Sequence, residues 1–270
     1  MKNEVDKLGI IAGIGDLPFL VAKCAIEKGQ FPVIIKLSKD EQPPYQDLQC
    51  KTYEYGVGQI GKITQKLLDH NVTHLILIGK VDPSILLSPL KIDTTAIRLL
   101  AQHRKKPSSI VSAILMHFQQ SGFSILNQDY YLTHLLPEPG ILTKRKPTTP
   151  QWEDINLGMN IARGVANLEI GQTVVIKNQI VLAVEAIEGT DHTICRGGEL
   201  GGKGVTVVKA ASKEHDFRID VPTVGMETLK AIHAIKGSVL AVEANRTFIM
   251  EPDTLYQQAE HWKISIVAVD

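Results

Sequence analysis

Short apolar runs and amphipathic helical segments alternate along the first half of the chain, and this alternation constrains the fold more than any other feature. Apolar runs at 7–13, 31–37 and 73–79 predict buried strands, and helical periodicity over 17–29 and 59–70 fills the intervals. Strands that are apolar on both faces and separated by helices are typical of a parallel sheet covered on both sides. The first half is therefore predicted to be a Rossmann-like α/β domain.

A proline-rich stretch separates this half from a second half of different texture. Residues 137–150 hold four prolines and no amphipathic period, which predicts a linker between a domain at 1–136 and a domain at 151–270. The second domain is predicted to contain a hairpin over 172–189 that turns at Lys177-Asn178. The predicted fold class is thus α/β, with an N-terminal Rossmann-like parallel-sheet domain and a C-terminal α+β domain.

Composition and charge exclude several classes of protein. Lys and Arg together number 29, as do Asp and Glu, so the net charge is zero, whereas surfaces that bind nucleic acid are usually basic. No run approaches the roughly 20 apolar residues that span a bilayer, and the first residues do not resemble a signal peptide. Cys24, Cys50 and Cys195 are widely spaced and form no CxxC pair. These features predict a reduced, cytoplasmic protein that binds no nucleic acid.

A glycine-containing turn lies directly between the first predicted strand and helix. Glycines there let backbone amides approach a phosphate, and the helix N-terminus adds partial positive charge. A plain tight turn is the alternative, as a solvated lysine is for Lys80 at the end of the third strand. A dehydrogenase is disfavoured, because Pro18 takes the third glycine position of the dinucleotide fingerprint and Lys36 lies where an acid is expected. The candidates for this side are Gly13, Gly15, Asp16, Leu17, Pro18, Gly79 and Lys80.

Charged residues gather in two segments of the second half. The stretch VEAIEGTD contains Glu185, Glu188, Thr190 and Asp191, and KAASKEHDFRIDVP contains Lys209, Lys213, Asp216, Arg218 and Asp220. If the second stretch is extended, its last three charged residues share one face. Carboxylates beside Lys and Arg suit a Mg²⁺ ion together with a phosphate, and a surface salt-bridge cluster is the alternative. The sequence contains neither an HExxH zinc pattern nor a GxSxG elbow.

These segments, in this order, resemble the UDP-2,3-diacylglucosamine pyrophosphatases of lipid A biosynthesis in Gram-negative bacteria, of the type unrelated to the metallophosphoesterase-fold enzyme. The resemblance covers nearly the whole chain, and its most specific parts are VLAVEAIEGTD and RIDVPTVG. Other matching stretches are GIIAGIGDLP, VGQIGK, GKVDPS, LLPEPGILTKRKP and AVEANRTFIM. The resemblance implies a nucleotide-binding N-terminal domain and a C-terminal domain that binds the acylated sugar phosphate and carries the acidic centre.

The family's reaction is the Mg²⁺-dependent splitting of the substrate's pyrophosphate into UMP and 2,3-diacylglucosamine 1-phosphate, lipid X. By resemblance, Gly13 to Pro18 with Gly79 and Lys80 lie on the nucleotide side. Asp220, Asp191 and Glu188 are the implied catalytic acids, and Asp220, Asp191 and Glu185 the implied metal ligands, with Asp220 indispensable. Thr190, Arg196, Lys209, Lys213 and Arg218 are the implied binding residues for the substrate. Which acid ligates the metal and which orients water stays open.

The sequence departs from the family at one helix, where Pro107-Ser108-Ser109 replaces a Gly-Asp-Asp motif that relatives commonly carry. The rival hypothesis is a non-catalytic sensor that binds a UDP-sugar or nucleotide without consuming it. The expected partner is the UDP-linked diacylated glucosamine. The expected location is the cytoplasm, with at most peripheral contact with the inner membrane, and a homodimer is left open.

Overall fold

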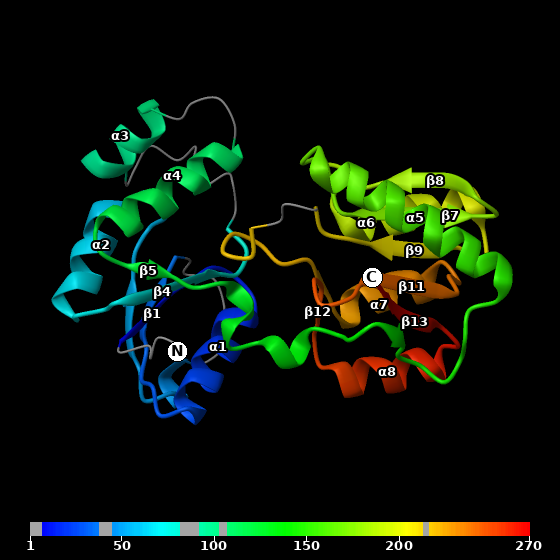
Figure 1. Cartoon of the computed structure of the whole chain (residues 1–270), viewed down its shortest axis with the longest axis horizontal. Coiled ribbons are helices and arrows are strands. Elements are labelled where there is room, and N and C mark those ends of the chain that lie inside the picture. The colour runs from blue at the N-terminus through cyan, green and yellow to red at the C-terminus, as the bar shows by residue number, and fades with distance from the viewer. Residues whose placement is uncertain (1–6, 38–44, 82–91, 103–106, 213–215) are drawn as a thin grey trace. The chain divides into compact units, whose positions relative to one another are not determined.

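The computed structural model describes residues 7–37, 45–81, 92–102, 107–212 and 216–270. The chain forms two compact units (Figure 1). Unit 1 comprises residues 1–132 together with 216–220, and unit 2 comprises 133–215 and 221–270. A five-residue segment from late in the sequence therefore belongs to the N-terminal unit.

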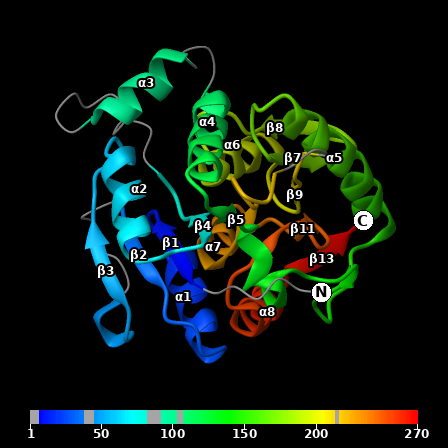
Figure 2. The same cartoon turned by 60° about the vertical axis from the view of Figure 1, so that its left-hand side comes forward.

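Unit 1 is built around a five-stranded parallel sheet with the strand order β3-β2-β1-β4-β5, the order of a Rossmann sheet's first five strands. Figure 2 shows the labels β3, β2, β1, β4 and β5 in this sequence across the sheet. Its elements are β1 (Leu8–Ala12), α1 (Leu17–Glu27), β2 (Val33–Lys36), β3 (Lys51–Glu54), α2 (Ile60–Asp69), β4 (His74–Ile78), α3 (Thr94–Gln102), α4 (Pro107–Gln120) and β5 (Ser124–Ile125), with short 3₁₀ turns at Tyr45–Asp47 and Gln128–Tyr130.

Alternate residues of the central strands of unit 1 face opposite helical layers. Ile11, Val33 and Leu75 pack in one apolar cluster with residues of α2, α3 and α4. Helix α1 contacts β1, and Val21 is one of the apolar residues that this helix buries. Burial on both faces explains why the strands read as continuous apolar runs, since a parallel sheet leaves no solvent-facing side.

Unit 2 contains a six-stranded mixed sheet with the order β6-β13-β11-β9-β7-β8. Strands β9, β11 and β13 are parallel, and β6, β7 and β8 pair antiparallel with their neighbours. Its elements are β6 (Gly140–Ile141), α5 (Thr149–Asn167), β7 (Thr173–Lys177), β8 (Ile180–Val184), α6 (Thr190–Gly201), β9 (Thr206–Lys209), β10 (Thr223–Val224), α7 (Met226–Ala234), β11 (Val239–Glu243), β12 (Phe248–Ile249), α8 (Pro252–His261) and β13 (Ser265–Val269), with a 3₁₀ turn at Thr133–Leu135.

The pleat of this second sheet sorts its side chains between two cores. Val239 and Ala241 of β11 face the cluster that includes Ile155 of α5. Leu240 and Val242 of the same strand face the cluster shared by α6, α7 and α8. The two cores confirm the predicted α/β class. Because β9, β11 and β13 are parallel, their carboxyl ends lie at one edge of the sheet.

Several sequence predictions differ from the structure in detail. The predicted linker at 137–150 carries β6, whose Ile141 pairs with Val267 of β13, so this stretch forms one edge of the second sheet. The hairpin turns at Asn178-Gln179 rather than one residue earlier. Both of these residues have positive φ, and their amides donate to the buried Asp154 carboxylate of α5 at 3.1 and 2.6 Å. An anchor on another element therefore sets the turn.

Strand β3 and helix α6 are among the elements that have no counterpart in the sequence prediction. The short strand β3 is largely exposed and lacks an apolar run. Helix α6 contains Gly197, Gly198 and Gly201, which weaken its helical signal in the sequence. A Cβ on Gly197 would lie 2.5 Å from Val175, so close packing against β7 requires this glycine. None of the described helices is both long and apolar enough to cross a bilayer.

Candidate functional site

The turn after β1 and the turn after β4 are joined by backbone hydrogen bonds. The Gly13 amide donates to Ile78 O at 2.8 Å, and Ile14 and Lys80 exchange amide–carbonyl bonds of 2.7 and 2.9 Å. These bonds form an isolated antiparallel bridge between Ile14 and Lys80. The predicted glycine turn and the predicted Gly79-Lys80 end of the third strand are thus brought together at the carboxyl edge of the first sheet, where open α/β sheets bind ligands.

The glycines of this junction serve different purposes. A Cβ on Gly13 would lie 2.5 Å from Lys80 O, and a Cβ on Gly79 would lie 2.8 Å from the Gly13 carbonyl carbon. These two glycines therefore allow two backbones to touch. Gly15 has φ +106°, and a Cβ on it would meet nothing within 4 Å, so it faces open space. Of the three, only Gly15 leaves room for a ligand to approach the backbone.

The residues at the N-terminus of α1 differ in how far they are exposed to solvent. Asp16 occupies the N-cap position without a side-chain capping bond, and it is exposed. Pro18 is buried and has no N–H to offer, while Leu17 and Lys80 lie at or near the surface. Burial and, to a lesser extent, the Asp16 charge raise the pKa of the Tyr45 phenol, which packs against Phe19 of α1 at 5.8 Å between ring centroids.

Asp220 ends a compact turn rather than lying on an extended strand. The Ile219 amide donates to Asp216 O at 2.9 Å, and the Arg218 guanidinium makes two bonds of 2.8 and 2.6 Å to the Asp216 carboxylate. The segment is therefore not extended, and the condition under which Asp216, Arg218 and Asp220 would share one strand face is not met. Arg218 is committed to Asp216, whose hydrogen bonds raise the pKa of the guanidinium.

The same turn belongs to unit 1, although the sequence predicted the whole acidic centre within 151–270. Gln128, which is 5% exposed, holds the turn there. Its amide nitrogen donates to Phe217 O at 2.8 Å, and its side-chain Nε2 donates to Ile219 O at 2.9 Å and to Leu77 O of β4 at 2.7 Å. Gln128 thus ties the Asp220 turn to the carboxyl end of β4.

In unit 2, Thr190 links an acid to a lysine. The Thr190 hydroxyl donates to Glu185 Oε1 at 2.9 Å and accepts from Lys209 Nζ at 2.9 Å. Glu185 Oε2 also accepts from the Gln172 amide at 3.2 Å. Lys209 is 7% exposed, so its charge is placed inside the protein beside a carboxylate-bound hydroxyl. The structure therefore brings three predicted site residues, Glu185, Thr190 and Lys209, into one hydrogen-bonded chain.

Glu188 and Arg196 form a separate pair at the start of α6. Arg196 Nη2 donates to Glu188 Oε1 at 2.6 Å and to Val184 O at 2.9 Å, and the Ala186 amide donates to Glu188 Oε2 at 3.2 Å. The backbone hydrogen bond of Glu188 itself and the bond from Arg196 lower the pKa of the Glu188 carboxyl. These contacts occupy Glu188 and Arg196 with each other, while Asp191 lies exposed in the first turn of the helix.

Within the described residues, no group of three or more His, Cys, Asp or Glu side chains is close enough to hold a metal ion. Mg²⁺ needs only one or two protein carboxylates when substrate phosphates supply further oxygens. The exposed carboxylates of Asp191 and Asp220 have the oxygen donors that Mg²⁺ prefers. Glu185 is instead held by Thr190 and Gln172, so it suits a positioning role better.

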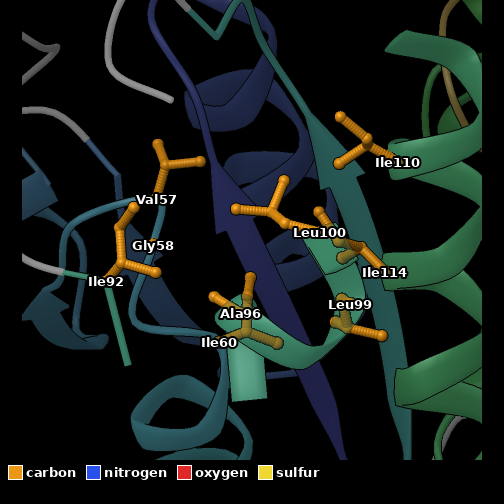
Figure 3. Close-up of a pocket in the computed structure, with 9 residues that line it drawn as sticks. All are labelled: Val57, Gly58, Ile60, Ile92, Ala96, Leu99, Leu100, Ile110 and Ile114. Atoms are coloured by element: carbon orange, nitrogen blue, oxygen red, sulfur yellow. The ribbon is translucent and has the colours of Figure 1, made fainter. Parts of the chain in front are cut away.

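An apolar pocket lies between α2, α3 and α4 of unit 1, and apart from Gly58 the described residues that line it have hydrocarbon side chains (Figure 3). Its space is about 20 Å³, enough for roughly one water molecule. Ile60, Ala96 and Leu99 of its lining belong to the core cluster of the same unit. This pocket is a gap in the hydrophobic core.

Some predicted residues lie outside the described part of the chain, and some described ones were missed. Lys213 falls among residues 213–215, and the side chains of Pro107, Ser108 and Ser109 are likewise outside it, although α4 begins at Pro107. Sequence reasoning missed Gln128 because a lone glutamine in a loop carries no motif. It also missed the buried Glu243. The Glu243 carboxylate accepts hydrogen bonds of 2.8 Å from the Arg163 guanidinium and 2.8 Å from the amide of Ala211, which follows β9.

Taken together, these features define a two-domain α/β protein whose polar candidate residues collect at the carboxyl ends of parallel strands. Family models of the LpxI N-terminal and C-terminal domains match residues 7–135 and 138–267. The chain belongs to the LpxI family. This finding confirms the resemblance stated from the sequence motifs.

A curated relative supports the same assignment. The chain is 26% identical over 275 residues to the UDP-2,3-diacylglucosamine pyrophosphatase LpxI of Caulobacter vibrioides, covering 98% of both chains. Among solved structures, a protein proposed to be an NAD-dependent epimerase/dehydratase from Methylobacillus flagellatus shares 11% identity with a TM-score of 0.28. That match covers 53% of this chain and 44% of the other. It is too weak to bear on fold or function.

Proposed function

We propose that the protein hydrolyses the pyrophosphate of UDP-2,3-diacylglucosamine to UMP and 2,3-diacylglucosamine 1-phosphate, in lipid A biosynthesis. The observation that carries this proposal is the family match along nearly the whole chain, with a relative that bears the pyrophosphatase name. The intact EGTD and IDVPT motifs support it. Because the substrate carries two acyl chains, the proposal also expects peripheral contact with a membrane surface.

In this proposal Asp220 is the essential catalytic acid. The Gln128 bonds fix its turn on unit 1, so the carboxylate is presented from a rigid support rather than from a loop. Water would attack the sugar-side phosphorus, and UMP would leave. Asp220 would orient that water or ligate the metal, and Asp191 is the second candidate for either role.

The unit 2 chain of hydrogen bonds supplies positive charge for the pyrophosphate. Lys209 is held by Thr190, which Glu185 orients, so its ammonium position is set before substrate binds. A preorganised cation can stabilise negative charge that develops on a phosphate without rearranging. Arg196 and Arg218 would have to leave Glu188 and Asp216 to do the same, which favours Lys209.

Magnesium is part of the proposal, with Asp220 as the residue that would hold it and Asp191 as the alternative. A bound Mg²⁺ would neutralise charge on the phosphate oxygens. Glu185 and Glu188, which the sequence also nominated, are proposed to position Thr190 and α6 through the contacts described above.

Hydrolysis of UDP-2,3-diacylglucosamine in ¹⁸O-water, with and without Mg²⁺, tests the proposal. The expected result is metal-dependent release of UMP, with the label in the sugar 1-phosphate. Label in UMP would contradict attack at the sugar-side phosphorus, and metal-independent turnover would contradict the role of Mg²⁺. Tight substrate binding without any turnover would refute the hydrolase and support the sensor.

A further inference from the structure

A basic hollow of about 350 Å³ lies on the surface of unit 2. We define it by six of its lining residues: Arg145, Lys203, His233, Lys236, Trp262 and Lys263. No Asp or Glu is among the described residues that line it. In a chain whose formal net charge is zero, this is a marked local excess of positive charge.

The basic hollow lies at the opposite end of the sheet from the candidate site. Lys203, Lys236 and Lys263 precede the amino ends of β9, β11 and β13 respectively, whereas Lys209 ends β9. A four-residue strand is about 10 Å long, so this strand separates the hollow from Lys209. Figure 1 labels β9, β11 and β13, which are neighbours in the sheet of unit 2.

The positive charges of the hollow form no ion pairs within the described part of the chain. None of Arg145, Lys203, Lys236 and Lys263 forms an ion pair among the described residues. The side chains of Lys203, Lys236 and Lys263 do not cap the helices that precede them, because other groups bond the carbonyls at those helix ends. The Lys236 and Lys263 amides donate to His233 O and Glu260 O at 2.9 and 3.1 Å, and Lys177 Nζ donates to the last carbonyl of α6, Gly201 O, at 2.7 Å.

The backbone does not favour lysine at two of these positions. Lys236 and Lys263 follow the ends of α7 and α8 with φ values of 56° and 58°. At such left-handed positions glycine or asparagine is the usual residue, because a Cβ is strained there. Two lysines therefore occupy positions where local folding would be better served by another residue.

An aromatic wall completes the hollow. The Trp262 indole stacks on the His233 imidazole, with 4.3 Å between ring centroids and 11° between the ring planes. Tryptophan is enriched at interfaces, membrane interfaces included, because its indole has an apolar body and a polar N–H. Trp262 also places an intrinsic fluorophore in the hollow.

We propose that the basic hollow binds a phosphate group, at a site separate from the pyrophosphatase centre. Convergent ammonium and guanidinium groups are the side chains that recognise phosphate. The same chemistry serves a phosphorylated solute and the headgroup of an anionic phospholipid. The proposal does not rest on the proposed function, because it uses none of the residues placed in the catalytic site.

Fluorescence of Trp262 tests this proposal directly. The chain has two tryptophans, so Trp152→Phe leaves Trp262 as the only one. We expect saturable quenching or enhancement by inorganic phosphate, and none by sodium chloride at equal ionic strength. In a second arm, flotation with vesicles of phosphatidylcholine alone or mixed with phosphatidylglycerol tests headgroup binding.

The decisive variant is Lys236→Asn with Lys263→Asn. Asparagine tolerates the left-handed conformation, so the fold should keep or raise its Tm while phosphate or anionic-vesicle affinity falls at least about tenfold. Lys23→Gln with Lys62→Gln removes two exposed charges from α1 and α2 and is the matched control.

The outcomes separate the two sources of phosphate. A phosphate response that the double Asn variant loses supports a solute site, and vesicle binding alone, lost in that variant, supports a headgroup site. The proposal is overturned if the wild-type chain responds in neither arm, or if the double Asn variant binds as well as the control.

Discussion

Unit 1 and unit 2 build the carboxyl edges of their sheets by different means. In unit 1, Gly13 and Gly79 let two turns meet backbone to backbone. Gln128 makes two hydrogen bonds to the turn at 216–220 and a third to Leu77 of β4. In unit 2, side-chain hydrogen bonds link Glu185 to Thr190 and Thr190 to Lys209. The first arrangement gives rigid positioning, and the second gives a fixed charge.

The largest expected effect comes from the turn that unit 1 holds. Asp220→Asn keeps the size of the side chain and removes its charge. If Asp220 is the essential acid, turnover of UDP-2,3-diacylglucosamine should fall at least about 10³-fold, while substrate still binds. Steady-state kinetics and equilibrium binding of the purified variant measure the two quantities. Turnover close to that of the wild type would remove Asp220 from the mechanism.

The backbone contact in unit 1 can be broken at Gly13. In Gly13→Ala the new Cβ would meet Lys80 O at 2.5 Å, and neither backbone can move aside cheaply. We expect a loss of about 2–4 kcal/mol in the free energy of unfolding.

Gly164→Ala is the matched control. Gly164 lies in α5, and a Cβ there would meet nothing within 4 Å. This change should raise the free energy of unfolding by about 0.5–1 kcal/mol. Urea denaturation of both variants makes the comparison. Equal effects would show that Gly13 is not a contact point.

The side-chain network in unit 2 can be cut at Thr190. Thr190→Val keeps the shape of the side chain but leaves Glu185 and Lys209 without their shared hydroxyl. We expect the free energy of unfolding to fall by about 1–3 kcal/mol, with a loss of kcat if Lys209 faces the pyrophosphate. Thr190→Ser restores the hydroxyl and should recover both. If Val and Ser behave alike, the hydroxyl has no such role.

The smallest expected effect concerns Glu188. Because its pKa is lowered in the folded protein, its contribution to stability is present above the unfolded-state pKa and is lost as the pH falls through the folded-state pKa. Arg196→Gln removes one cause of the shift and should raise the pKa of Glu188 toward its usual value. NMR titration of the carboxyl carbon measures this change. An unchanged pKa would show that Arg196 does not stabilise the carboxylate.

Local patterns account for much of the fold and less of the site. The apolar runs predicted β1, β2 and β4 because burial on both faces leaves a continuous signal. Helix α6 was missed because its glycines read as a loop, whereas close packing on β7 requires one of them. The glycine turn and the acidic segment were found as motifs. The Gln128 contacts were not, because they join residues about 90 positions apart.

A double-mutant cycle between Gln128 and Asp220 tests most directly whether unit 1 presents the essential acid. Gln128→Met removes the side-chain donor to Ile219 O and to Leu77 O while keeping the residue's length. Alone, it should lower kcat about 10- to 100-fold with little change in KM. If Gln128 acts by positioning Asp220, the same substitution in the Asp220→Asn background should cost almost nothing further. Fully additive losses would contradict the account.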